Sequence, residues 1–161
     1  MLRRIIQILL GVAIVVLGYF LYQSVQGPVK WQNEKTKRYD KIKERLEDIR
    51  TAQTSYKAAN KHYAKTFVDL TWYLNQGHLK RRNGQTISPA DSLFGPGYNV
   101  FSIQYVPGGG QVKFNMEVKI DEKDSTEYLE VSDPKPFDPE DPLSFGSLTE
   151  STLKASWETE K

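Results

Sequence analysis

The chain has 161 residues, 39% of them hydrophobic and 26% charged, which suits one modest globular domain with an additional anchor. It has no cysteine, and His62 and His78 have no partner at metal-ligand spacing, so zinc sites and Ser-His-Asp triads lack their parts. The net charge of +2 conceals a split, because residues 28–82 hold 14 Lys/Arg against 6 Asp/Glu (+8) and residues 83–161 hold 6 against 14 (−8), which predicts a charge dipole.

An apolar segment from Ile5 to Tyr22 follows a short basic start, residues 1–4. It has no charged residue, and Gln7 is its only strongly polar one. As an α-helix it rises about 27 Å, close to the thickness of a bilayer's hydrocarbon core. The alternative is a cleaved secretory signal, but no small-residue cleavage site follows, so residues 5–22 are predicted to be a retained transmembrane helix.

Two glycines of this segment, Gly11 and Gly18, are seven positions apart and share one helix face. Small residues let helices approach closely in lipid, and Gln7 can add a hydrogen bond between helices. The spacing differs from the Gly-x-x-x-Gly pattern, so the sequence leaves open whether this face mediates oligomerisation.

The flanking charges disagree about the orientation of this helix. Arg3 and Arg4 favour a cytoplasmic N-terminus, whereas seven Lys and Arg between positions 30 and 45 favour a cytoplasmic location for the rest of the chain. The absence of cysteine does not decide between them, because both a reducing cytosol and a periplasm tolerate it.

Gly27 and Pro28 predict a kink or short break after the anchor, because glycine relaxes the backbone dihedrals and proline lacks a donor. Beyond them, Trp31 and its neighbouring lysines are typical of a segment at the lipid head groups. Residues 28–82 are expected to form an amphipathic helix and a short second helix.

Apolar residues recur at steps of three, four and seven between Tyr39 and Tyr63, which predicts a helix with one buried face. Several charge pairs along it repel each other, so we expect its buried stripe to hold it in place. That stripe is Tyr39, Ile42, Leu46, Ile49, Tyr56 and Tyr63.

A second, shorter helix is indicated by the stretch "TFVDLTWYLNQG". Thr66 is the expected N-cap, with Asp69 three residues later, and Gly77 is suited to the C-terminal end.

Alternating apolar and polar residues in 83–161 predict three strands, at 98–106, 111–120 and 126–132. Turn-forming residues at Pro107–Gly110 and Asp121–Ser125 separate them. The simplest arrangement is a three-stranded antiparallel meander covering the stripe of the long helix, which makes the fold class α+β.

The remaining segments read as loops. Residues 83–97 have loop composition, and residues 133–147 are rich in proline. The second segment is expected to pack as a surface strap through Phe137, Leu143 and Phe145. The tail after it is expected to form one helical turn carrying Leu153 and Trp157.

Two acidic clusters are weak candidates for calcium, around Asp121 and Asp124 and around Asp138 and Asp141. Neither matches a defined calcium loop, and solvated turns have the same composition. The basic run from His78 to Gly84 could contact phosphate, but without interleaved aromatic residues it does not indicate nucleic acid. His62 is expected to flank the end of the long helix, and no cofactor is expected.

The stretch "RLEDIRTAQTSYKAANKHYAKTFVDLTWYL", Arg45 to Leu74, and the order of elements resemble type IV pilins and the pseudopilins of secretion systems. The chain departs from their pattern in two ways, because no glycine precedes the apolar run and no glutamate lies within it. In this respect it is more similar to uncharacterised single-pass envelope proteins of Bacteroidota.

The resemblance implies a membrane helix continuing into an amphipathic helix that packs on a three-stranded antiparallel sheet. It also implies a bacterial inner-membrane protein with a periplasmic domain, acting as a structural subunit in a homo- or hetero-oligomer. Since no nucleophile and base pair stands out among the residues, enzymatic activity is not expected, and neither is a nucleic-acid partner. Some pseudopilins bind calcium in a C-terminal loop. A function of another class stays open: a tethered module that binds a ligand in a groove beside the loop "SPADSLFGPG", Ser88–Gly97.

Overall fold

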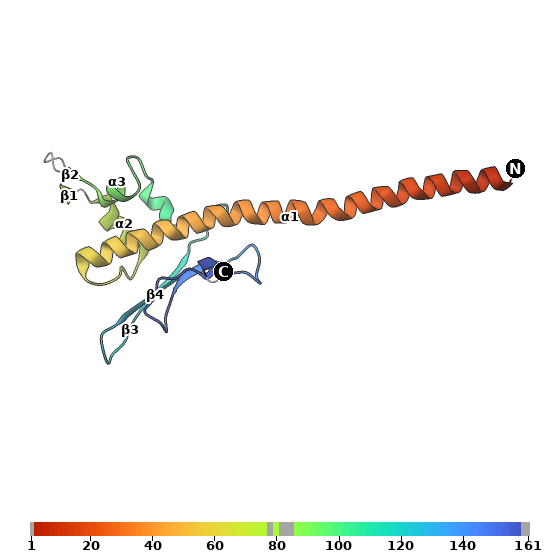
Figure 1. Ribbon diagram of the computed structural model, residues 1–161. Coiled ribbons are helices and arrows are strands. Elements are labelled where there is room, and N and C mark those ends of the chain that lie inside the picture. The colour runs from red at the N-terminus through yellow and green to blue at the C-terminus, as the bar shows by residue number, and fades with distance from the viewer. Residues whose placement is uncertain (1, 77–78, 81–85, 159–161) are drawn as a thin grey trace. The chain divides into compact units, whose positions relative to one another are not determined.

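The computed structural model describes residues 2–76, 79–80 and 86–158 (Figure 1). The fold is α+β, with a long N-terminal helix that contains the apolar segment and a three-stranded antiparallel sheet. The chain divides into two compact units, Met1–Lys37 and Arg38–Lys161.

The first unit consists of the N-terminal part of helix α1 (Leu2–Asn60). The helix is continuous through Gly27 and Pro28, so the short break is wrong, and the kink given as its alternative stays a prediction. A proline inside a helix removes one i to i−4 hydrogen bond, and the bonds of the neighbouring turns are sufficient here to keep the chain helical.

The second unit begins with the C-terminal part of α1, which carries the apolar stripe except for Tyr63. α1 ends at Asn60, three residues before Tyr63, because Lys61 adopts a left-handed conformation with φ of 70°. The Lys61 N–H donates to the Lys57 carbonyl over 2.8 Å, as in a helix that ends in a left-handed residue. Tyr63 therefore enters the core from the turn after α1. Five residues of the stripe are buried and Tyr56 is half-buried; the five are Tyr39, Ile42, Leu46, Ile49 and Tyr63.

Helix α2 (Phe67–Asn75) begins where its sequence predicts. The Asp69 N–H donates to Thr66 Oγ1 over 3.2 Å, and the Thr66 hydroxyl donates to the Asp69 carboxylate over 2.7 Å, which confirms the N-cap. Leu70 and Leu74 face the core. Gly77 lies outside the described residues.

The three-stranded sheet contains β3 (Asn115–Ile120), β4 (Glu127–Ser132) and β5 (Ser144–Ser147), antiparallel and in chain order. The first two lie within predicted strands, and the predicted turn Asp121–Ser125 joins them through a Ser125 N–H to Asp121 carbonyl bond. The third comes from the proline-rich segment that was expected to be a loop, so that prediction is wrong for residues 144–147.

The strand predicted at 98–106 is also wrong, because a 3-10 helix, η1 (Val100–Gln104), occupies that segment. Its buried residues are Val100, Ile103 and, just beyond it, Val106. They are three positions apart, which matches the three residues per turn of a 3-10 helix. Phe101 is 62% exposed.

Short elements complete the second unit. β1 (Leu79–Lys80) pairs with β2 (Thr86–Ile87), and helix α3 (Pro89–Leu93) follows. The loop predicted for residues 83–97 is therefore wrong for residues 86–87 and 89–93. The tail forms a 3-10 turn, η2 (Ser156–Glu158), with Trp157 in it and Leu153 before it.

The proline-rich segment, residues 133–147, packs on α1, as was expected of it as a surface strap. Leu143 and Phe145 are buried, and Phe137 lies under the Arg38 guanidinium, 4.6 Å from the ring centre. The Tyr39 hydroxyl donates to the Asp141 carbonyl over 2.7 Å. Within this unit, α1 has the sheet on one side and α2 and α3 on another (Figure 1).

Candidate interaction surfaces

The apolar segment of α1 is a candidate membrane span by length and composition. Its most apolar 18-residue window has a mean hydropathy of 2.4, and none of that window is buried within the chain. A Cβ added at Gly11 or Gly18 would meet nothing within 4 Å. The face that these glycines and Gln7 could offer to another helix stays a prediction.

Beyond that segment, Trp31 is 46% exposed and Lys35 Nζ lies 5.7 Å from its ring centre. A lysine over an indole is a cation–π contact, and an amphipathic ring beside cations is the usual composition of a head-group anchor.

A buried glutamine fastens the end of α1 to the turn that follows it. Gln53 is fully buried, its amide donates to the Ala64 carbonyl over 3.0 Å, and the Ala64 N–H donates back over 2.9 Å. The same amide nitrogen lies 3.0 Å from Met116 Sδ in β3. A polar residue beside an apolar stripe gives no sequence signal of this role, so the role of Gln53 is not predictable from the sequence.

Some basic residues of the first half of the chain pair with acidic residues of the second half. Arg50 in the basic α1 pairs with Glu158 of the acidic tail over 2.8 Å. Lys57 lies 3.7 Å from Glu127, whose carboxylate also accepts from the Tyr63 N–H over 3.0 Å. Because these ion pairs are partly exposed, they add little to the free energy of unfolding. Their main effect is to orient the segments that they join.

Asp48 and Tyr98 form a half-buried polar pair that joins α1 to the segment before η1. The Tyr98 hydroxyl donates to the Asp48 carboxylate over 2.6 Å, and its ring stacks on Phe94 with centres 4.4 Å apart. Burial, and then this hydrogen bond, raise the pKa of Tyr98 above its ordinary value of 10. Burial also raises the pKa of Asp48, although the bond from Tyr98 and the charge of Arg45 oppose that shift.

The acidic clusters are built as turns. Asp121 and Asp124 accept from main-chain N–H groups of the β3–β4 turn over 2.8 and 2.9 Å. The bond from Thr126 lowers the pKa of Asp124. Asp138 accepts from the Glu140 N–H over 3.1 Å. In residues 2–76, 79–80 and 86–158, no three His, Cys, Asp or Glu side chains are grouped as they would be around a metal ion.

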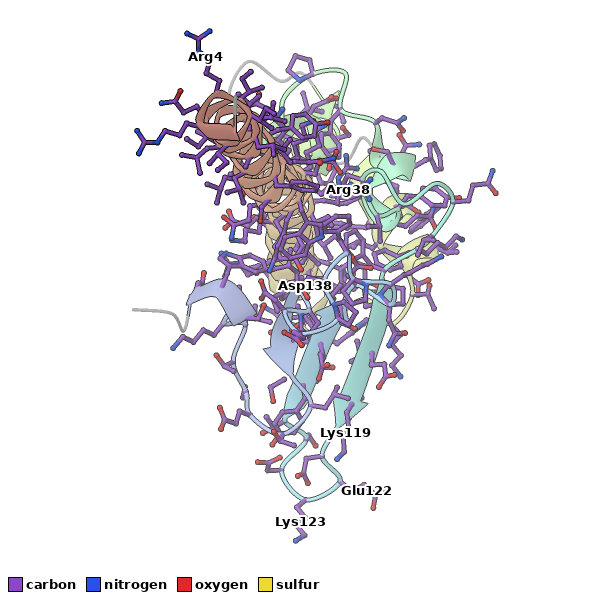
Figure 2. The ribbon with its side chains drawn as sticks, turned by 90° about the vertical axis from the view of Figure 1, so that its right-hand side faces the viewer. Arg4, Arg38, Lys119, Glu122, Lys123 and Asp138 are labelled. Carbon is purple, nitrogen blue, oxygen red and sulfur yellow. The ribbon has the colours of Figure 1, made fainter. Side chains whose placement is uncertain are left out.

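The structure therefore does not bring either pair of calcium candidates into such a group. Figure 2 shows Glu122 and Lys123 at the tip of the hairpin, well away from Asp138. Three of the four candidate carboxylates, those of Asp121, Asp124 and Asp138, accept from main-chain N–H groups of their own turns.

His62 lies just after α1, as expected. Its Nδ1 is 3.1 Å from the Tyr63 carbonyl, and its ring meets that of Tyr56 edge to face with centres 5.6 Å apart. Most of the basic run from His78 to Gly84 lies outside the described residues, so its phosphate-binding role stays a prediction.

The end of α1 and α2 form an open groove of about 440 Å³. Val68 and Trp72, one turn apart on α2, are 74% and 68% exposed. Tyr56 and Tyr73 line the groove with ring centres 5.2 Å apart. An exposed valine and tryptophan beside tyrosines is a composition enriched at protein interfaces.

A second open groove, of about 480 Å³, lies beside α3. Its lining includes Arg50 and Ala58 of α1, Leu93 of α3 and Leu153 of the tail. Leu93 belongs to the Ser88–Gly97 segment, so a groove does lie beside that loop. Arg50 points its guanidinium at Glu158.

No protein-family model, curated protein or solved structure matches this chain.

Proposed function

We propose that this chain is a single-pass structural subunit of a bacterial envelope assembly, pseudopilin-like in layout and without enzymatic activity. In this proposal α1 crosses the inner membrane, and the domain that follows lies in the periplasm and contacts neighbouring subunits. The observation that carries it is that one helix, α1, supplies both an exposed apolar segment of bilayer length and the buried stripe of an α+β domain.

The surface of α2 supports a role in lateral contacts. Large exposed apolar side chains on one helix face are common at interfaces, where a tryptophan often contributes a large share of the binding energy. Val68 and Trp72 form such a face, whereas Phe101 is exposed on a different element, η1. The partners are other copies of this chain or other subunits.

The size of the native complex in mild detergent tests this proposal. The full chain should migrate well above its monomer mass of 18.5 kDa. Trp72→Ala should shift the complex toward the monomer, with a loss of about 2 kcal/mol or more if this ring is central to an interface. Phe101→Ala is the matched control and should leave the size unchanged. A monomer at both low and high salt would contradict the proposal.

Topology needs a separate test. Protease added to spheroplasts should digest the domain after α1, while a cytoplasmic marker remains intact. Protection of the domain until the membrane is disrupted would place it in the cytoplasm, which is the orientation that the charges between positions 30 and 45 favour.

A tethered ligand-binding module is the second candidate, and the groove beside α3 is the observation that favours it. In that case the full chain in detergent should sediment with purified peptidoglycan sacculi. Ala58→Trp, which fills the groove, should abolish this sedimentation without changing the size of the native complex. For a purely structural subunit, sedimentation should be absent or independent of this substitution.

A further inference from the structure

The two edges of the three-stranded sheet differ. The outer edge of β5 is covered by the tail, because the Gly146 N–H donates to the Lys154 carbonyl over 2.9 Å and Phe145 pairs with Ala155. Among the described residues, no main-chain hydrogen bond reaches the outer edge of β3 between Asn115 and Ile120. An uncovered edge strand is a template for another strand.

The hydrogen-bond register shows which residues of β3 face outward. The Asp121 N–H donates to the Thr126 carbonyl over 2.9 Å, and this pair continues the register of β3 with β4. Hydrogen-bonded pairs alternate along an antiparallel ladder, so Lys119, Glu117 and Asn115 direct their main-chain groups to β4. The N–H and C=O groups of Met116, Val118 and Ile120 therefore point away from the sheet.

We propose that the outer edge of β3 pairs antiparallel with β3 of a second copy of this chain, in a two-fold arrangement centred on Val118. In this register Val118 faces Val118 and Met116 faces Ile120 of the other copy, which satisfies the outward main-chain groups. The contact is isologous, since both copies use the same strand. The proposal extends the structural role inferred above by naming one partner.

Charge selects this register. Centring on Val118 places Glu117 opposite Lys119 of the other copy, twice by symmetry, on the solvent face of the sheet. Centring on Glu117 would place glutamates opposite each other, and centring on Lys119 would place lysines opposite each other, both of which repel. On the other face, pairing would cover Ile120, which is 44% exposed in one copy.

Charge reversal tests the register in the full-length chain. Two differently tagged copies are co-expressed and extracted in mild detergent, and recovery of the second tag with the first is measured. Glu117→Lys or Lys119→Glu alone turns both attractive pairs into repulsive ones and should weaken self-association about tenfold. The double variant E117K/K119E should restore it, because opposite charges face each other again.

The hairpin tip offers matched controls. Glu122→Lys and Lys123→Glu change the net charge by the same amounts outside the proposed pairing, and Figure 2 shows these side chains at the tip beyond Lys119. Both controls should self-associate like the natural chain. The proposal would be overturned if the second tag were recovered equally for all chains. It would also be overturned if the double variant self-associated as weakly as the single variants.

Cross-linking gives an independent readout, because the natural chain has no cysteine. Facing residues of a non-hydrogen-bonded pair have Cα atoms about 4.5 Å apart, within disulfide range. A Glu117→Cys chain should therefore cross-link to a co-expressed Lys119→Cys chain and not to a Glu122→Cys chain. A large native complex with neither this cross-link nor the charge response would overturn the β3 contact while leaving the structural proposal standing.

Discussion

At the scale of single residues, the fold depends on a glycine in β5. Gly146 has φ of 81°, and a Cβ there would overlap the main-chain oxygen of Leu129 in β4. Its N–H also holds the tail through the Lys154 carbonyl. Because the clash is with main chain in the centre of the sheet, no side-chain rotation relieves it.

Gly146→Ala should therefore destabilise the second unit by about 3 kcal/mol or more, the sum of backbone strain and steric overlap. Thermal unfolding of the full chain in detergent, followed by near-ultraviolet circular dichroism, measures this. Gly110→Ala is the matched control, because Gly110 has φ of 73° but open space around a Cβ. Equal losses for the two variants would mean that backbone strain alone matters at Gly146.

Tyr98 links one hydrogen bond to the pH dependence of stability. Its pKa is raised in the folded chain, so the unfolded chain loses the hydroxyl proton first as pH rises above about 10. The stability contributed by the protonated phenol is complete below that pH and is lost as the pH increases further. The natural chain should therefore become less stable above about pH 10.

Tyr98→Phe should reduce that alkaline loss, at a cost near neutral pH of about 1 kcal/mol for the missing hydrogen bond. Unfolding temperatures in detergent, measured below and above about pH 10, give the slope of stability against pH. Tyr128→Phe, a substitution in β4, is the control and should keep the natural slope. An unchanged slope in Tyr98→Phe would show that another group dominates, such as Tyr56, whose pKa burial also raises.

At the scale of elements, the sequence is informative where structure depends on near neighbours. The capping of α2 by Thr66 and the turn at Asp121–Ser125 follow from residues a few positions apart, and the stripe of α1 follows from helical periodicity. Such patterns can be recognised without knowledge of the rest of the fold.

Elements that depend on distant contacts were not predictable. β5 is short and rich in small residues, and it becomes a strand only because β4 and the tail lie on either side of it. Segment 98–106 alternates in polarity, but its buried residues follow a period of three, and η1 packs against α2. The role of Gln53 was not predictable for the same reason, since Met116 lies far from it in sequence. The uncovered edge of β3 was not predictable either, because the segment expected to form the strand beside it forms η1.

At the scale of the whole molecule, the apolar segment of α1 is exposed and long enough to cross a bilayer. In the proposed function it is covered by lipid or by other helices, and these two environments predict different results when charge is introduced. An arginine at the centre of a membrane helix raises the insertion free energy by about 2.5 to 3.5 kcal/mol. Ile14→Arg with Leu17→Arg should therefore cost about 6 kcal/mol of insertion free energy or more. The double variant should leave the membrane pellet during alkaline carbonate extraction.

Tyr22→Arg is the matched control, because an arginine at the end of the segment can extend its charge to the head groups. This variant should stay in the pellet, as the natural chain should. That result would show that retention depends on how deep in the bilayer the charge lies. If the double variant also stays in the pellet, the apolar segment is held by other protein helices. The anchor would then belong to the assembly and not to the bilayer.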